Sequence, residues 1–157
     1  IAEGLETVRG VDRRFQVKGV VRGVTVVDDY GHHPTEILAT LQAAREGGYG
    51  RVLVLFQPHR FTRTRDLMTE FAGAFGDADF VEVLDIYAAS EEPIAGVTAQ
   101  ALVKEIGRAG VAYTGSVAEG VEALAREAKE GDVILTLGAG SVSHAGALLL
   151  EALGTNG

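Results

Sequence analysis

The residues best able to do chemistry gather in three short segments, at positions 28–36, 56–65 and 137–143. The first reads Asp-Asp-Tyr-Gly-His-His-Pro-Thr-Glu, which puts two carboxylates and two imidazoles within one turn. Such groups exchange protons, orient polar substrates or bind metal ions. A capped helix with solvent-exposed polar residues would explain the same string. The crowding of acids, an aromatic ring and imidazoles in so short a stretch favours a binding turn.

The second segment is a basic loop in an acidic chain. It contains Arg60, Arg63 and Arg65 and has no acid before Asp66, whereas the whole chain has 14 basic and 22 acidic residues and a net charge of −8. Residues three apart on an early helical turn share a side, so Arg60 and Arg63 would face the same way. Guanidinium groups bind phosphate or carboxylate through paired hydrogen bonds. We therefore predict an anion site here, rather than surface arginines paired with acids.

The third segment carries Gly138 and Gly140 after an apolar run. Glycines let a backbone approach a ligand closely, and a following helix start adds N–H donors. The signal is weak, because Ser143 stands where the dinucleotide-binding motif has its third glycine. A Gly-x-x-x-x-Gly-Lys-Ser/Thr phosphate loop is missing from the chain, and so is a Gly-x-Ser-x-Gly nucleophile turn. Any phosphate loop must therefore come from elsewhere.

The histidines do not define a metal site by their spacing. His32 and His33 are adjacent and point in different directions, whereas a zinc-type metal usually takes three or four convergent ligands. Nothing in the spacing requires the other two histidines to join them. We therefore predict no metal held by this chain. We leave open that Asp28 or Asp29 orients a substrate or helps to hold a magnesium-bound nucleotide supplied from elsewhere.

Short apolar strands alternate with helical patterns, and this alternation must position the three segments. Strands are expected at 24–27, 51–56, 80–84, 111–113 and 133–137, and helices at 34–46, 64–75, 97–106, 117–128 and 143–153. Such alternation is typical of a parallel sheet covered on both faces. Segments 13–18 and 20–27 lie too close for a crossover helix and should pair as a hairpin. We predict an α/β fold, a three-layer Rossmann-like open sheet of five parallel strands plus one antiparallel N-terminal edge strand, with helices on both faces.

This fold would bring the three segments to one edge of the sheet. Ligands of open α/β sheets bind beyond the carboxyl ends of the strands. Each chemical segment starts where an expected strand ends. We therefore expect the turn at 28–36 and the arginine loop to share a rim that faces a cleft, which another part of the polypeptide must complete.

Length and composition fit one domain over residues 1–157. The chain is 46% hydrophobic and 23% charged, which excludes a disordered protein, and it has no apolar run of about 18 residues that could span a membrane. The absence of cysteine removes disulfides and thiol catalysis and favours a reducing compartment. The net negative charge opposes nucleic-acid binding. Because the chain starts at Ile1 rather than Met, we expect a piece of a longer protein or a processed product.

The three segments, with Arg-Arg-Phe-Gln at 13–16, resemble the C-terminal domain of the Mur ligases. The resemblance is to the branch that adds L-alanine to UDP-N-acetylmuramate in peptidoglycan synthesis. It implies a cytoplasmic, ATP-dependent reaction in which a carboxylate becomes an acyl phosphate and an amine then attacks it to form an amide. It also implies that ATP and Mg²⁺ are bound mainly by a central domain and the UDP-sugar by an N-terminal domain. Both domains are absent from this chain, which would close over them and be inactive alone.

Matched position by position, the resemblance gives six residues a role. The catalytic positions are Arg60, Arg63 and His32, and the nucleotide-binding positions are Arg14, Asp29 and Tyr30. The two catalytic arginines would lie near the muramoyl substrate and the incoming amino acid, where they could neutralise a carboxylate or the charge of the acyl phosphate. The chain departs from the family at Ser141, where the family usually has an acid.

Three other functions stay open at this point. A murein-peptide recycling ligase has a similar His-His-Pro motif, but typically with Phe-Ala in place of Tyr30-Gly31. A stand-alone metal-dependent phosphoesterase could use the acids and histidines of 28–33, although Gly31 stands where its motif has an acid. The third is a non-catalytic module that binds anions.

Overall fold

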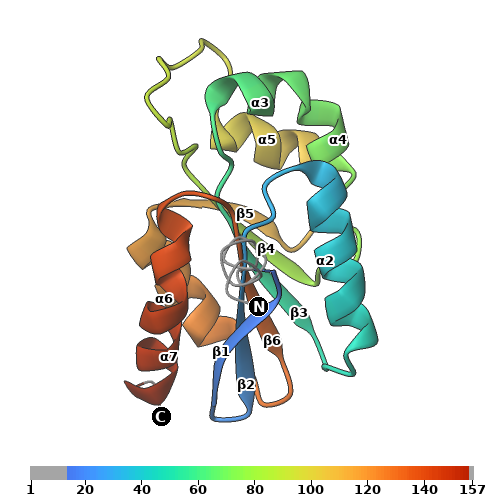
Figure 1. Ribbon diagram of the computed structural model, residues 1–157, viewed down its shortest axis with the longest axis vertical. Helices are drawn as coiled ribbons and strands as arrows, with labels where there is room; N and C mark the ends of the chain where they lie inside the picture. Colours follow the sequence, from blue (N-terminus) through green and yellow to red (C-terminus); the bar gives the residue numbers. More distant parts are fainter. Residues whose placement is uncertain (1–13, 156–157) are drawn as a thin grey trace, which may run out of the picture.

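The computed structural model describes residues 14–155 and contains one six-stranded sheet. The strands are β1 (Gln16–Val21), β2 (Val24–Asp29), β3 (Val52–Phe56), β4 (Phe80–Leu84), β5 (Val111–Gly115) and β6 (Val133–Leu137). They lie in the order β1-β2-β6-β3-β4-β5 (Figure 1). Only the β1–β2 pair is antiparallel. The predicted sheet, with five parallel strands and an antiparallel edge strand, is confirmed.

Helices cover both faces of the sheet. They are α2 (Pro34–Glu46), α3 (Phe61–Asp66), α4 (Met68–Ala72), α5 (Ala99–Ile106), α6 (Val117–Glu127) and α7 (Ala145–Thr155), the last preceded by a short 3₁₀ helix, η1 (Ser141–His144). In Figure 1 the helices α6 and α7 lie on one side of the strands and α2 on the other. Among the described residues, no helix has the length and apolar character needed to cross a membrane.

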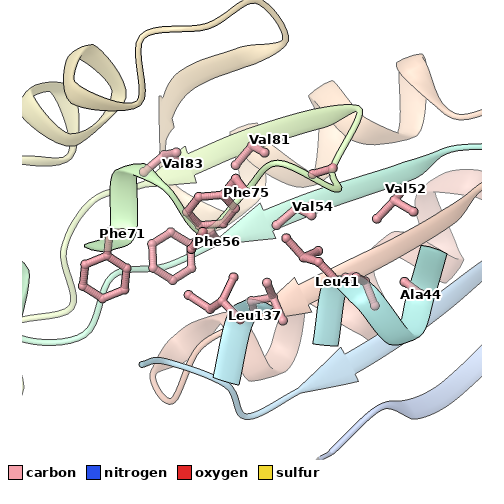
Figure 2. Packing of buried hydrophobic residues seen from close by; sticks show 14 of the residues in the cluster. Leu41, Ala44, Val52, Val54, Phe56, Phe71, Phe75, Val81, Val83 and Leu137 are labelled. Atoms are coloured by element: carbon pink, nitrogen blue, oxygen red, sulfur yellow. The ribbon is translucent and has the colours of Figure 1, made fainter. Parts of the chain in front are cut away.

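The central strand β3 shows why its sequence is apolar throughout. All five of its side chains are buried. Val52, Val54 and Phe56 belong to the core under α2, α4 and α5 (Figure 2), whereas Leu53 and Leu55 belong to the core under α6 and α7. Successive side chains of a strand point to opposite faces of the sheet. Because helices cover both faces here, every side chain of β3 is buried and its sequence is apolar throughout.

The β1–β2 hairpin turns later than the sequence predicts. The strands were expected at 13–18 and 20–27, but the turn is at Arg22-Gly23, where φ is +55° and +78°. Two successive residues with positive φ are typical of a type I′ turn, whose twist matches that of paired strands. The pairing also shifts between Val17 and Gly19. The start of the predicted hairpin, Arg13, lies outside the described residues.

Two predicted helices differ from those in the structure. The single helix expected at 64–75 starts earlier, at Phe61, and is divided at Leu67 into α3 and α4. The helix expected at 143–153 begins as the 3₁₀ turn at Ser141 and becomes α-helical at Ala145. The other predicted helices end within two residues of the observed ones. The early start of α3 has a physical cause outside its own sequence, described below.

Candidate functional site

Three strand ends meet at the carboxyl edge of the sheet. Because β6 lies between β2 and β3, the residues after these strands are neighbours. The N–H of Gly138 donates to the carbonyl of Asp29 at 3.2 Å, and the N–H of Gln57 donates to the carbonyl of Leu137 at 3.0 Å. Backbone hydrogen bonds therefore join the three chemical segments at the points where their strands end.

The turn before α2 is shaped by a capping box. His33 is the N-cap residue, and its Nδ1 accepts the N–H of Thr35 at 3.2 Å. Glu36 returns the contact, since its Oε1 accepts the N–H groups of His32 and His33, each at 3.1 Å. Pro34 fills the first helical position, where its missing N–H costs nothing. His33 is thus used to start the helix, whereas the His32 ring is left to contact other loops.

Asp29 is buried, with 4% of its surface exposed, and it fixes the backbone around it. Its Oδ1 accepts the N–H of Gly31 and its Oδ2 accepts the N–H of Phe15, both at 2.7 Å. A Cβ at position 31 would lie 2.9 Å from Oδ1, so the glycine is needed for this close approach. The neighbouring Asp28 accepts the hydroxyl of Thr136 at 2.7 Å. Asp29 therefore joins the turn to the segment that carries Arg14.

A row of four rings, Tyr30, His32, His59 and Tyr87, runs across three loops of this edge. Ring centroids are 5.0 Å apart for Tyr30 and His32, 5.8 Å for His32 and His59, and 5.5 Å for His59 and Tyr87, which are stacked. Edge-to-face and stacked pairs at these distances are favourable. The turn at 28–36 and the arginine loop therefore share one rim, as their places at strand ends predict.

His59 links the ring row to the arginine loop. Nη1 of Arg63 lies 3.2 Å from Nδ1 of His59 and also donates to its carbonyl at 3.3 Å. A guanidinium can only donate, so Nδ1 accepts and the proton of neutral His59 sits on Nε2. Burial lowers the pKa of His59, and the nearby His32, Arg63 and Arg60 lower it further, against a smaller opposing effect of Glu91. His59 is therefore a neutral imidazole at pH 7.

The arginine turn itself is held from a distant loop. Arg60 is exposed and has a φ of +75°, and α3 begins directly after it. The carboxylate of Glu91 accepts the N–H of Phe61 at 2.6 Å, the N–H of Thr62 at 3.0 Å and the hydroxyl of Thr62 at 2.5 Å. This contact replaces an N-cap and explains why α3 starts three residues before the predicted position.

Arg14 is joined to the same rim through Glu36. Its Nη2 lies 3.3 Å from Oε2 of Glu36 in an exposed pair. Burial alone would raise the pKa of Glu36, but the N–H groups of His32 and His33 and the charges of His32 and Arg14 lower it overall. Glu36 is thus a carboxylate at neutral pH. With this contact, all six residues singled out in the sequence lie along one edge of the molecule.

The sequence pattern assigns no role to Gln57, Tyr87 or Glu91, which hold the loops together. Gln57 accepts the N–H of Val142 at 3.0 Å and donates to the hydroxyl of Ser141 at 2.8 Å. A Cβ at Gly140 would lie 2.6 Å from both the Gln57 Oε1 and the Tyr87 ring. The close approach that Gly140 permits is therefore to the protein's own side chains. The strand-end rule could have identified Tyr87, which follows β4.

Two other features of the described residues, metal-ligand clusters and a large surface hollow, do not mark this rim. Within residues 14–155, no group of three or more His, Asp or Glu side chains is arranged to hold a metal ion. A hollow of about 750 Å³ lies at the opposite edge of the sheet, where its walls include Arg22, Arg126 and Lys129. None of the six residues named above lines it, so we place the functional edge at the rim.

Comparison with known proteins agrees with this geometry. The family described as "Mur ligase, glutamate ligase domain" matches residues 13–140. The chain belongs to the Mur ligase family. A relative from Acidobacterium capsulatum, named UDP-N-acetylmuramate–L-alanine ligase, is 61% identical over 153 residues, which are 98% of this chain and 33% of the relative. The Mur ligase domain described here thus spans about a third of the length of the curated relatives it matches.

Solved Mur ligase structures share the fold of this domain. The UDP-N-acetylmuramate–alanine ligase of Thermotoga maritima is 28% identical, with a TM-score of 0.69, over 99% of this chain and 33% of that one. A domain from Haemophilus ducreyi, described as part of a UDP-N-acetylmuramate:L-alanyl-γ-D-glutamyl-diaminopimelate ligase, is 33% identical with a TM-score of 0.66. It is covered over 99% of its own length and 89% of this chain. Domains of this kind have therefore been crystallised by themselves.

Proposed function

We propose that this chain is the C-terminal domain of an ATP-dependent ligase that joins L-alanine to UDP-N-acetylmuramate in peptidoglycan synthesis. The observation that carries the proposal is the shared rim, where the ring row and the arginine turn meet at the carboxyl edge of the sheet. Relatives 61% identical and named for this reaction support the substrate assignment. The other two domains, for the UDP-sugar and for ATP, would lie in the rest of a longer protein, in the cytoplasm where both nucleotides are found.

The catalytic contribution of the rim would be to place positive charge. When bound by the central domain, ATP with Mg²⁺ supplies the phosphoryl group that activates the substrate carboxylate. Arg60 and Arg63 would face the anionic groups of this step, either the acyl phosphate or the carboxylate of the incoming alanine. Fixed donors aimed at developing charge in a closed site are a major source of rate enhancement. His32 would line the cleft beside them, in contact with the neutral ring of His59.

The nucleotide-binding contribution would come from the other end of the rim. Arg14 is exposed and could reach a phosphate when the domains close. Tyr30 offers an exposed aromatic ring to a nucleotide. Asp29 would act from its buried position by holding the backbone of both segments, and its two oxygens already accept one N–H each. Closure of such a half-site over a central domain would position the reactants and exclude water.

A comparison of the isolated chain with the full-length protein tests this function. We expect the full-length protein to release phosphate from ATP only when both UDP-N-acetylmuramate and L-alanine are present, and to form the amide. The 157-residue chain alone should do neither. Steady ATP turnover by the chain alone, or no ligation by the full-length protein, would contradict the proposal.

The amine substrate separates this function from its nearest alternative. A murein-peptide recycling ligase would use a peptide amine in place of L-alanine. Relatives 61% identical and named for L-alanine ligation favour L-alanine, and the turn differs from the Phe-Ala of the recycling enzymes, whose methyl group would lie 2.9 Å from Asp29 Oδ1 here. We therefore expect turnover with L-alanine and not with L-alanyl-γ-D-glutamyl peptides. The reverse result would assign the recycling activity.

A further inference from the structure

Arg60 has a strained backbone that the surrounding chain must hold in place. Its φ and ψ are +75° and 140°, outside the regions that side-chain-bearing residues normally adopt. Such strain costs about 1–3 kcal/mol and persists only where neighbouring contacts enforce it. The N–H of Arg60 donates to the carbonyl of Tyr87 at 2.8 Å, and its carbonyl accepts the N–H and hydroxyl of Thr64 at 3.2 Å and 2.8 Å. Strain of this kind is concentrated at functional sites.

The N–H groups next to Arg60 depend on a single carboxylate. The Arg60 side chain makes no cap for α3, so the first N–H groups of the helix need an outside acceptor. Glu91 provides it, with one oxygen bound to the N–H groups of Phe61 and Thr62 and the other to the Thr62 hydroxyl. These contacts, led by the hydroxyl, lower the pKa of Glu91. Glu91 is therefore ionised at neutral pH and can accept all three hydrogen bonds.

The loop that carries Glu91 is built to present it. Tyr87, on the same loop between β4 and α5, donates its N–H to the carbonyl of Pro58 at 2.8 Å and so pairs the two loops. Ala89 and Ser90 have φ values of +51° and +74°, which turn the chain sharply just before Glu91. The loop lies at the same end of the molecule as α3 (Figure 1). Two residues with positive φ on the acceptor side, Ala89 and Ser90, and one on the donor side, Arg60, thus flank the hydrogen bonds to this carboxylate.

We propose that Glu91 is a positioning residue of the ligase reaction, which holds Phe61 and Thr62 so that Arg60 and Arg63 face the substrate anion. The inference rests on the proposed role of the two arginines. Glu91 acts through the backbone and leaves the guanidinium groups available, since within residues 14–155 neither forms an ion pair with a carboxylate. Without Glu91, the N–H groups of Phe61 and Thr62 lose their acceptor and the turn at Arg60 can relax.

Substitution of Glu91 in the full-length ligase tests this role. We expect Glu91→Ala to lower kcat/KM by about 10- to 100-fold, mainly in kcat, because a small displacement of a catalytic group has effects of this size. Glu91→Gln keeps an acceptor for both N–H groups and a partner for the Thr62 hydroxyl, so it should stay within about threefold of the wild type. Glu92→Gln, the same charge change at the adjacent exposed position, is the matched control and should leave kcat/KM unchanged.

A readout that separates positioning from general stability is the coupling between Glu91 and Arg60. Glu91→Ala should lower kcat/KM by a smaller factor in an Arg60→Ala background than in the wild type, because the part of its effect that acts through Arg60 is already lost there. The proposal would be overturned if the kcat/KM loss of the double variant Glu91→Ala/Arg60→Ala equalled the product of the losses in the two single variants. It would also be overturned if Glu91→Ala kept wild-type kcat/KM, or if Glu91→Gln fell as far as Glu91→Ala.

Hydrogen exchange in the same full-length variants distinguishes failure of this inference from failure of the proposed function. Glu91→Ala should speed amide exchange at Phe61 and Thr62, and Glu91→Gln should not. If the wild type did not ligate alanine, the proposed function would be wrong, and unchanged exchange in Glu91→Ala would still refute the role of Glu91 separately. Should Glu91→Ala not fold, Thr62→Ala is expected to lower kcat/KM and Thr62→Ser to restore it, and equal activity of the two would count against the proposal.

Discussion

Arginines at opposite edges of the sheet are used in opposite ways. Just before β3, at the amino-terminal edge, Arg51 binds the buried carboxylate of Asp132 at 2.8 Å and both the carboxylate and the carbonyl of Glu127, at 3.0 Å and 2.9 Å. The hydrogen bonding of Arg51 to the Asp132 carboxylate, which accepts, is the main cause that raises the pKa of Arg51. At the carboxyl edge, Arg60 and Arg63 have no carboxylate partner among residues 14–155.

This difference separates arginines that hold the fold from arginines that can bind a ligand. A buried carboxylate is stable only when its partner is fixed and its remaining oxygens are satisfied, and Asp132 also accepts the N–H of Lys129 at 2.7 Å. Arg51 is fully committed to such contacts and lies over the ring of Phe80 at 5.3 Å. Arg63 instead orients a neutral imidazole, and Arg60 is exposed. Neither side chain is used in an ion pair among the described residues, so both can meet an anion that arrives at this rim.

The largest effect should follow removal of a rim arginine from the full-length ligase. We expect Arg60→Ala or Arg63→Ala to reduce kcat by about 10²- to 10³-fold, as the loss of a charge-stabilising donor does, with the melting temperature nearly unchanged. Arg65→Ala is the matched control, because Arg65 is exposed on the same helix and pairs with Asp66 at 2.8 Å. Steady-state kinetics measure kcat, and thermal melts measure the melting temperature. Wild-type kcat in both rim variants would remove these arginines from the site.

At the other edge the expected effect is on stability. Asp132→Asn should lower the free energy of unfolding by about 2–3 kcal/mol, between the values for surface and fully buried pairs, because Arg51 is about a quarter exposed. Ligation by the full-length variant should stay near the wild-type rate at temperatures where it is folded. Glu122→Gln, which breaks the exposed pair with Arg126, serves as the control and should change stability by less than about 0.5 kcal/mol. Urea unfolding measures the change in unfolding free energy of both variants. Equal changes for Asp132→Asn and Glu122→Gln would contradict a structural role for the Arg51–Asp132 pair.

Two helices that start at the functional edge show how much of the fold could be predicted. The start of α2 is encoded locally, by His33 at the N-cap, Pro34 at the first position and Glu36 in the capping box, and its predicted range of 34–46 matches the structure. The start of α3 depends on Glu91, which is 30 residues further along the chain than Phe61. Local sequence therefore predicted the first helix well and placed the second three residues too late.

The same distinction applies to the candidate site. The strand-end rule brought the turn at 28–36 and the arginine loop to one edge, because the carboxyl ends of parallel strands lie at the same edge of a sheet whatever the strand order. The rule could not show which side chains join the loops. Gln57 contacts Ser141 across 84 positions, and Tyr87 stacks on His59 from a loop that no motif marked. Such contacts depend on how loops pack, and no local pattern records them.

A smaller effect, in pH dependence, should also distinguish the two edges. The folded protein binds a proton at His59 less readily than the unfolded chain does, because burial and the neighbouring His32, Arg60 and Arg63 lower its pKa, despite the opposing charge of Glu91. Unfolding therefore takes up a proton as the pH falls through the unfolded pKa of about 6.5. The stability of the wild-type chain should decrease below that pH.

Removal of the imidazole should flatten this dependence without changing the amino-terminal edge. We expect His59→Asn to show a smaller loss of unfolding free energy between pH 8 and about pH 5.5 than the wild type, measured by urea unfolding at each pH. His144→Asn, at an exposed position of η1, should keep the wild-type slope. The Arg51–Asp132 pair remains intact in both variants, so any difference between their slopes belongs to the rim. Equal slopes in the two variants would mean that burial and the cations around His59 together do not oppose its protonation, which would contradict the lowered pKa of this imidazole.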